Sequence, residues 1–434
     1  MLSALARAFR TPDLRRKLLF TLAIMALFRL GSFVPLPGVS YVNVRSCIDG
    51  ASAAGGLALI NLFSGGALLQ LSVFALGIMP YITASIIVQL LTVVIPRFEA
   101  LKEEGQAGTS KLTQYTRYLT IGLAVLQSTT LVAIARNPGG LFPSCPTDLV
   151  PSDTVVTILI MIITLTAGTG LIMWLGEVVT ERGVGNGMSL LIFTSIAAGF
   201  PGSLWAIRTS SGIDVLLVVI ALGLVVMALV IFVELSQRRI PVQYAKRMVG
   251  RRMYGGTSTY IPIKVNTAGV IPVIFASSLL YLPALVSQFQ QGSQAGWVVW
   301  IQNNLASQSS PWHISIYVLL IIFFTYFYVS ITFNPTEVAD NMKKYGGFVP
   351  GIRPGKPTAD YLDFILSRIT LPGALYLGLI AVMPNFFFIW LNSDQYVNFP
   401  FGGVAVLIMV GVGLETVKQI ESQLMQRNYE GFLR

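Results

Sequence analysis

Apolar residues in this chain come in runs of about 20, separated by shorter polar segments rich in Lys and Arg. A run of that length with few charges is typical of a helix that crosses the hydrocarbon core of a bilayer. The pattern predicts ten membrane-spanning helices, at Leu18–Val34, Ser72–Ile95, Tyr118–Ala135, Val155–Leu175, Met188–Ile207, Val215–Val233, Ala268–Val286, Ile314–Thr332, Leu371–Leu391 and Phe401–Leu414. The fifth span is the least regular, because Gly199-Phe200-Pro201-Gly202 interrupts it.

One further apolar segment, Leu57–Leu69, is too short to cross a membrane and carries Ser64-Gly65-Gly66 in its middle. Apolar stretches of about 10–14 residues are typical of re-entrant or buried segments. Lipid cannot satisfy a broken backbone, so we expect this segment to lie inside the protein or to line a cavity.

Composition agrees with the pattern. Of 434 residues 54% are hydrophobic and 11% are charged, and the mean hydropathy is +0.71. A soluble domain carries about 25% charged residues. These values exclude a cytosolic enzyme, a secreted scaffold and a disordered chain, and they predict an all-α polytopic membrane protein.

The net charge of +10 is distributed unevenly over the connecting segments. Basic residues crowd one side of the predicted membrane, and the other side has only Arg45, Arg136 and Arg208. Lys and Arg accumulate on the cytoplasmic side of membrane proteins, so we expect both termini to be cytoplasmic. Leu2, Leu5, Ala6 and Phe9 share one helical face, which predicts a helix lying on the cytoplasmic surface before the first span.

Ten spans divide into two sets of five at an external linker, residues 201–214. The predicted N-terminal half is 1–200 and the C-terminal half is 215–434. Because five is odd, any similarity between the halves has to be inverted across the membrane. Inverted repeats place the functional site at their interface, near the midplane.

The residues give little basis for enzyme chemistry. Within the predicted spans Arg29 is the sole ionisable residue, which argues against proton coupling. One histidine, His313, and two cysteines, Cys47 and Cys145, cannot assemble a conventional zinc site. The segment Gly351–Thr358 misses the phosphate-binding pattern, because Pro357 follows Lys356 and the glycine spacing is short by one. We therefore expect no enzyme activity, no metal and no cofactor, and an energy source supplied by a partner.

Cys47 and Cys145 both fall on the predicted external side. A disulfide and a pair of unpaired loop thiols are both compatible with their positions, because sequence does not fix the distance between them.

Two long basic segments, 234–265 and 334–368, are predicted on the cytoplasmic side. Charge that only fixes topology is one interpretation. A docking platform for RNA phosphate or an acidic protein face is the other, because the segments are longer than topology needs and carry aromatic residues and planar arginines. Their candidate docking residues are Arg238, Arg239, Lys246, Arg247, Arg251, Arg252, Arg353 and Lys356.

In the second span Ile78, Ile82 and Ile86 recur at every fourth position and form one apolar stripe. Such a stripe faces lipid, packs on a neighbouring helix or lines a pore. Together with the re-entrant segment, it favours a hydrophobic constriction closed by a plug.

Several blocks of the chain resemble the bacterial SecY family, the central subunit of the Sec protein translocase. They are INLFSGGAL (Ile60–Leu68), FALGIMPYITASIIVQLLTVV (Phe74–Val94), ERGVGNGMSLLIF (Glu181–Phe193), QRRIPVQYAKR (Gln237–Arg247), NTAGVIPVIFASS (Asn266–Ser278) and GGFVPGIRPGKPT (Gly346–Thr358). The resemblance runs from the first span to the C-terminal LMQRNYEGFL and implies two five-helix halves around a pore, with a short re-entrant plug helix.

The resemblance also implies roles for named residues. A pore ring comprises Ile78, Ile82, Ile86, Met188, Ile192, Ile274 and Ile408. The plug comprises Leu57, Ile60, Asn61, Leu62, Phe63, Ser64, Gly65, Gly66 and Leu69, and a lateral gate toward lipid has Gln89, Thr92, Gln127, Asn266, Ser277 and Ser278 as its polar candidates. Arg353 matches the family's essential loop arginine. Met188 departs from the commoner branched residue, but Met is flexible and apolar.

The implied function is a channel that passes signal-bearing unfolded polypeptides across the bacterial plasma membrane and releases hydrophobic segments into lipid. The implied partners are the SecE and SecG membrane subunits, the SecA motor ATPase, the ribosome, signal peptides, nascent chains and lipid. A secondary transporter of small solutes is the alternative that also has ten spans with breaks, but the near absence of charge inside the spans argues against it. A purely structural scaffold explains neither the re-entrant segment nor the basic platforms.

Overall fold

The computed structural model describes residues 9, 11–48, 64–136, 149–151, 154–244, 247–249, 252–254, 258–289, 296–306, 310–391 and 402–430. Helices dominate these residues, and seven of them are long and apolar enough to cross a membrane. A bent pair, α5 and α6, makes an eighth candidate span with a bend of 104° at its break.

The first part of the chain forms α2 (Pro12–Gly31), α3 (Tyr41–Ile48), α5 (Met79–Val94), α6 (Pro96–Glu103), α7 (Gln106–Arg136) and α8 (Val155–Arg182). Proline sets several of these starts: Pro12, Pro80 and Pro96 each lie in a first turn, where the missing N–H has no intrahelical partner to lose.

Helix α9 (Gly187–Leu235) contains both the fifth and the sixth predicted span. It has one non-helical residue, Gly212, with φ of 87°, and the two apolar spans are Gly187–Thr209 and Gly212–Leu235. Most of the predicted linker 201–214 is therefore helical. Pro201 is accommodated inside the helix, since in a membrane the backbone has to satisfy its own hydrogen bonds.

The rest of the chain, as far as the structure describes it, adds two small sheets, six α-helices and one π-helical turn. Its elements are β1 (Gln237–Tyr244), β2 (Arg247–Val249), β3 (Arg252–Tyr254), β4 (Ser258–Lys264), α10 (Ile271–Phe289), α11 (Gly296–Ile301), the π-helical turn η2 (Gln302–Ala306), α12 (Pro311–Thr332), α13 (Pro335–Lys344), β5 (Gly347–Phe348), α14 (Lys356–Leu391) and α15 (Gly403–Glu430). Strands β4, β1 and β5 form one antiparallel sheet in that order, and β2 pairs with β3.

Each of the ten predicted spans coincides with a helix or with one half of α9. Two of these helices, α2 and the described apolar part of α10, are not themselves long and apolar enough to count as membrane spans. Helix α2 begins with Asp13, Arg15, Arg16 and Lys17, which lower its mean hydropathy. Several helices continue past the predicted span ends, most of all α14, which begins at Lys356 rather than near Leu371, and α15, which ends at Glu430 rather than near Leu414.

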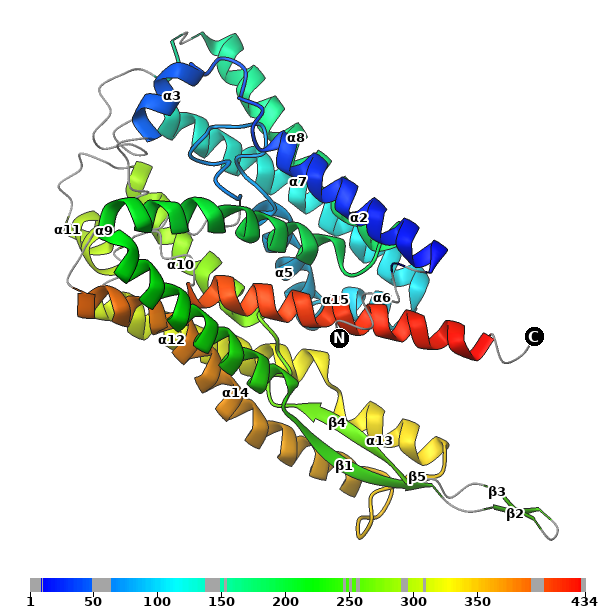
Figure 1. Cartoon of the computed structure of the whole chain (residues 1–434). Coiled ribbons are helices and arrows are strands. Elements are labelled where there is room, and N and C mark those ends of the chain that lie inside the picture. Colours follow the sequence, from blue (N-terminus) through cyan, green and yellow to red (C-terminus); the bar gives the residue numbers. More distant parts are fainter. Residues whose placement is uncertain are drawn as a thin grey trace.

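Figure 1 shows how these elements are arranged. Helices α2, α7 and α8 lie on one side of the molecule, α12 and α14 lie on the other, and α15 and the first half of α9 run between them. The sheet, α13, α6 and the C-terminal end of α15 lie toward one end, and α3 and α11 lie at the opposite end. A large apolar core joins α2, α8, α9, α10, α12, α14 and α15, so the first and second parts of the chain share one interior.

Candidate functional site

Five of the seven candidate pore-ring residues are buried in the same apolar core. Ile78, Met188 and Ile192 come from the first part of the chain, and Ile274 and Ile408 come from the second. Ile82 is half-buried and packs against this core, and Ile86 is half-buried and lies outside it. The structure thus brings together six candidates that are more than 300 residues apart at the extremes of the sequence.

Two local features position the residues that α9 contributes. Asn186 caps the helix, because its side-chain oxygen accepts hydrogen bonds from the backbone nitrogens of Met188 and Ser189 at 3.1 and 3.3 Å. Gly187 then lets α9 approach α8 closely, since a Cβ at this position would collide with the carbonyl oxygen of Gly176. The first turn of α9, with Met188, is thereby fixed against α8.

The candidate plug lies partly outside the described residues: Leu57, Ile60, Asn61, Leu62 and Phe63 are not described. In the described part of the predicted plug Ser64–Leu69 form turns, and turns continue to Ile78 except at Ser72, which makes an isolated bridge with Pro35. Positive φ angles at Gly65, Gly66, Leu71 and Gly77 explain these turns, because such angles end a right-handed helix.

This stretch is held inside the protein. The side-chain oxygen of Ser64 accepts from the Leu68 nitrogen at 3.1 Å, and the Ser72 hydroxyl donates to the Ala67 carbonyl at 3.3 Å. Ser64, Ala67 and Leu68 are buried and Leu69 is half-buried against a second apolar core, to which α7 and α8 contribute. We name Ser64–Leu71 the plug turn.

Arg29 connects the first span to the plug turn. Its Nη1 donates to the carbonyl oxygen of Gly65 at 2.6 Å, and its guanidinium lies 4.7 Å from the centre of the Phe33 ring. Arg29 stands out in the sequence as the sole ionisable residue of the predicted spans, but the sequence does not indicate which group it contacts.

Five of the six candidate lateral-gate residues lie in α5, α7 and α10, and Asn266 lies just before α10; α5 contacts α10 directly. Thr92 is buried and donates to the Gln89 carbonyl at 2.6 Å, whereas the Gln89 side chain is exposed and Gln127 is half-buried. Ser277 is buried and donates to the Ile274 carbonyl at 2.9 Å, and the buried hydroxyl of Ser278 has no partner among the described residues.

Asn266 is directed toward α9. Its amide nitrogen donates to a Glu234 carboxylate oxygen at 2.6 Å and to the Gly269 carbonyl at 3.2 Å, which connects the end of α9 to the start of α10. The Asn266 side-chain oxygen is buried without a partner among the described residues.

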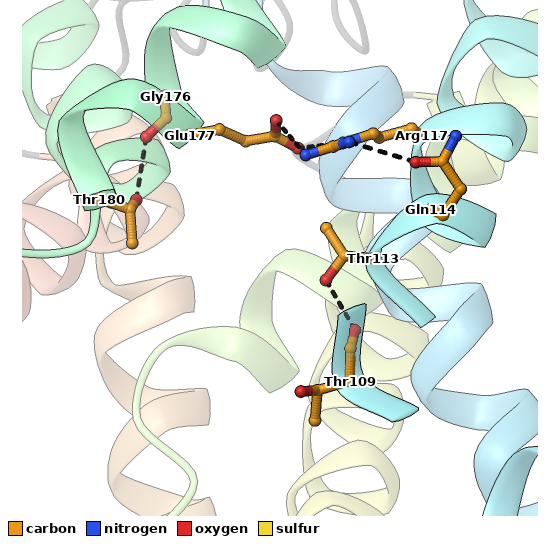
Figure 2. A network of polar contacts seen from close by, with 7 residues as sticks. All are labelled: Thr109, Thr113, Gln114, Arg117, Gly176, Glu177 and Thr180. Carbon is orange, nitrogen blue, oxygen red and sulfur yellow. Dashed lines mark hydrogen bonds and ion pairs between the residues drawn. The ribbon is translucent and has the colours of Figure 1, made fainter. Parts of the chain in front are cut away.

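A second polar contact that the sequence did not predict joins α7 to α8. Arg117 binds Glu177 through two nitrogens, each 2.8 Å from a carboxylate oxygen, and also donates to the Gln114 side chain at 3.2 Å. Figure 2 shows the two charged side chains extended toward each other from their helices. Both residues lie just beyond the ends of the predicted spans Tyr118–Ala135 and Val155–Leu175.

The basic segments are folded. Strand β1 pairs with β4 along its length and with β5 at its end, where Gln243 faces Phe348 and Tyr244 faces Gly347. One face of this sheet packs on α12, α13 and α14 through Ile240, Val242 and Ile263. Strands from both predicted basic loops therefore share one sheet, β4-β1-β5, which we name the basic-segment sheet.

Arg353 and Lys356 are exposed in a fixed turn at the start of α14. The buried Thr358 hydroxyl donates to the Arg353 carbonyl at 2.8 Å, and Gly351 and Gly355 adopt positive φ. Arg238 and Arg239 are exposed on β1, and Arg239 stacks over Tyr260 of β4 at 4.8 Å. Lys246 and Arg251 lie outside the described residues, as do the side chains of Arg247 and Arg252.

The surface helix before the first span, apart from Phe9, and Cys145 also lie outside the described residues, and the side chain of Cys47 is not described. Among the side chains that are described, no group of three His, Cys, Asp or Glu lies close enough to hold a metal ion.

Comparisons with known proteins give a consistent result. The SecY family model matches residues 72–417 of the chain. A protein translocase subunit SecY from Streptomyces scabiei is 66% identical over the full length of both chains, and one from Mycobacterium bovis is 62% identical, again over both full lengths.

Solved structures agree at the level of the fold. A structure of a protein-conducting channel matches with a TM-score of 0.64 and 19% identity, covering 94% of this chain and 91% of that one. Sec61 in a canine ribosome–channel complex matches with a TM-score of 0.61, also at 19% identity and with the same coverage.

Proposed function

This chain belongs to the SecY family of protein translocase subunits, and from that premise we propose how its residues form and close a protein-conducting pore. As a member of this family the chain is a multi-pass membrane protein and a channel subunit, not an enzyme. We propose that it works in a bacterial plasma membrane with both termini in the cytoplasm. We further propose that it passes signal-bearing unfolded polypeptides and releases hydrophobic segments into lipid.

The observation that supports the pore assignment best is the burial of Ile78, Met188, Ile192, Ile274 and Ile408 in one apolar core shared by both parts of the chain. In our proposal these side chains, with Ile82 and Ile86, form the pore ring. A narrow apolar throat excludes hydrated ions, because removing their water is costly and the throat dewets. Flexible Ile and Met side chains offer no directional bonds, so they can surround many polypeptide sequences.

We assign the plug to residues 57–69 and the lateral gate to the surfaces of α5, α7 and α10. The turns at Ser64–Leu71 support a plug that moves as a compact unit, because its hydrogen bonds are largely internal. A signal segment would enter between α5 and α10 because its apolar surface prefers lipid to water. It would favour the open state by binding that state more tightly.

We assign docking of the driving partner to the basic-segment sheet and to the turn that holds Arg353. Exposed arginines on a rigid support suit bidentate contacts with phosphate or carboxylate. The proposed partners are a SecA motor ATPase and the ribosome, with SecE and SecG as small membrane subunits. A solved yeast Ssh1 complex, bound to the 80S ribosome, has the same fold at 16% identity and a TM-score of 0.64.

A site-specific photo-crosslink tests the pore assignment. A crosslinker replaces Ile274 in membranes that carry a stalled, radiolabelled secretory chain, and the matched control replaces Leu279, which is 44% exposed on the same helix. We expect a crosslink from position 274 that requires the signal sequence and disappears when the chain is released, and little from position 279.

A second arm measures ion conductance. Ile274→Asn and Ile408→Asn place an amide in the apolar ring, so we expect ion leak and export of substrates with weakened signals. Absence of crosslinks from positions 274, 82 and 408 during normal export, together with unchanged conductance, would show that the pore assignment is wrong and would reopen the transporter hypothesis.

A further inference from the structure

Arg29 is a charged residue near the end of α2, the helix that coincides with the first predicted span. No carboxylate among the described residues pairs with it, and its hydrogen bond there is to the backbone of the plug turn. We propose that Arg29 is a positioning residue that latches the plug turn in the closed channel. This inference rests on the plug assignment made above and identifies what holds that plug.

The contact has the features of a strong hydrogen bond. A guanidinium nitrogen lies 2.6 Å from the Gly65 carbonyl oxygen, and the donor carries a full charge. A hydrogen bond from a charged group contributes about 1.5–3 kcal/mol, which corresponds to a factor of roughly ten to a hundred in an equilibrium. A charged side chain inside a membrane protein is costly, so its placement against one carbonyl indicates a function there.

The backbone around Gly65 aims that carbonyl at Arg29. Gly65 has φ of +66°, which a residue with a side chain rarely adopts. An added Cβ would lie 3.1 Å from both Cα and O of Ser195 on α9 and 3.2 Å from Nη1 of Arg29. The plug turn is therefore wedged between α2 and α9, one helical turn from Ile192 of the candidate pore ring.

A purely helical role for Arg29 would be to compensate the dipole at the end of α2. The last carbonyls of the helix are already used, because those of Phe28, Arg29 and Leu30 accept from the backbone nitrogens of Ser32 and Phe33. The guanidinium instead reaches 36 residues along the chain to Gly65.

The latch can be reversible because Arg29 has a second, independent contact. The Phe33 ring lies 4.7 Å from the guanidinium and belongs to the same segment, so it stays beside Arg29 when the plug turn moves. Opening the channel then removes one charged hydrogen bond and leaves the cation on an aromatic face.

Thiol labelling of the resting channel tests the latch. The full-length chain, with Cys47 and Cys145 replaced by Ser, carries Ala67→Cys as a reporter, since Ala67 is buried in the plug turn. A membrane-impermeant maleimide is applied to proteoliposomes. We expect Arg29→Met to speed labelling at least tenfold, and Arg29→Lys to give a smaller increase because the charge remains on a shorter side chain.

Two controls separate the latch from general loosening. Arg208→Met removes another arginine that stacks on an aromatic ring, Trp205 at 5.2 Å, and should leave labelling unchanged. A reporter at Ala124, which is equally buried in α7, should label at the same slow rate in every variant. An Arg29 whose role is only to stabilise α2 would change both reporters together, and that result would overturn the proposal.

Gly65→Ala provides a second route if Arg29→Met fails to assemble. The added methyl group displaces the carbonyl while Arg29 stays intact, so labelling of Ala67→Cys should rise to a similar extent. If the two residues act through one contact, the double variant should label no faster than the faster single variant. Additive effects would contradict the latch.

Labelling and conductance together distinguish a failure of the proposed latch from a failure of the proposed pore ring. Unchanged labelling in Arg29→Met and Gly65→Ala, with ion leak in Ile274→Asn, would remove the latch and leave the pore. Unchanged labelling together with an unchanged Ile274→Asn conductance would count against both.

Discussion

At the scale of single residues, burial decides which charged contacts hold this fold together. The side chains of Arg117 and Glu177 are 40% and 18% exposed, and they meet through two hydrogen bonds in a fixed geometry. The side chains of Lys111 and Glu104 are 59% and 49% exposed, and they meet at one distance of 3.3 Å. Exposed pairs contribute little, because water screens them and long side chains lose freedom.

We therefore expect Arg117→Ala to lower the free energy of unfolding by about 1–2 kcal/mol, because a partly buried Glu177 loses its partner. Lys111→Ala should change it by less than about 0.5 kcal/mol. Thermal unfolding of the purified protein in detergent would measure both. Glu177→Ala completes a double-mutant cycle, and a coupling energy near zero between positions 117 and 177 would show that the bidentate contact adds no stability.

The residue scale is also where the sequence was least informative. Ile78, Ile82 and Ile86 could be selected by their spacing, and Arg29 by its isolation, but neither signal names a partner. Arg117 and Glu177 are 60 residues apart and lie just outside apolar runs, where charges are expected in any membrane protein. Pairings of this kind depend on how helices pack, which is information that no local pattern carries.

At the scale of elements, the apolar runs predicted the positions of the helices correctly but did not predict the residues at which the helices begin and end. Helix α14 extends far before its apolar run because the basic-segment sheet gives its first turns a surface to pack on. The described part of the plug, Ser64–Leu69, forms turns although its composition is apolar, because Gly65, Gly66 and Leu71 adopt positive φ. The predicted interruption at Pro201 is absent, because helix formation there outweighs local preference.

Helix caps provide a matched pair of tests. Asn186 caps α9 and Asn334 caps α13, each by accepting from two backbone nitrogens in the first turn. We expect either Asn→Ala change to destabilise its helix by roughly 1 kcal/mol. Asn186→Ala should also raise ion leak, because Met188 and Ile192 follow the cap, and Asn334→Ala should not.

Conductance and thermal unfolding of the two variants would measure these effects, and replacement of either asparagine by Asp should preserve function, since Asp caps equally well. Equal leak in Asn186→Ala and Asn334→Ala would show that the α9 cap has no specific influence on the pore.

At the scale of the whole molecule, the two basic segments act as one unit because β5 joins them at the edge of β1. Gln243 and Phe348 are paired residues on antiparallel strands, at a separation that suits a disulfide. We expect Gln243→Cys with Phe348→Cys, in a chain lacking Cys47 and Cys145, to form a disulfide and to retain motor- or ribosome-driven transport.

Transport of a radiolabelled secretory chain into vesicles, with and without reductant, would measure the effect. Recovery of activity only after reduction would mean that the two segments have to separate during the transport cycle, contrary to our expectation. Arg353→Glu is the comparison variant in which we expect docking of the driving partner to be lost, because it reverses an exposed charge outside the strands of the sheet.

The kink in α9 at Gly212 has a mechanical consequence. Since the two apolar halves of this helix meet at Gly212 alone, their ends are tethered by a single residue and cannot drift apart at that point. Relative movement of the two parts of the molecule is then a rotation about Gly212, and the displacement of a residue grows with its distance from Gly212. For two rigid parts joined at one pivot the separation is widest at the edge farthest from Gly212, so a small change of angle at Gly212 moves helices at that edge apart by the width of a side chain.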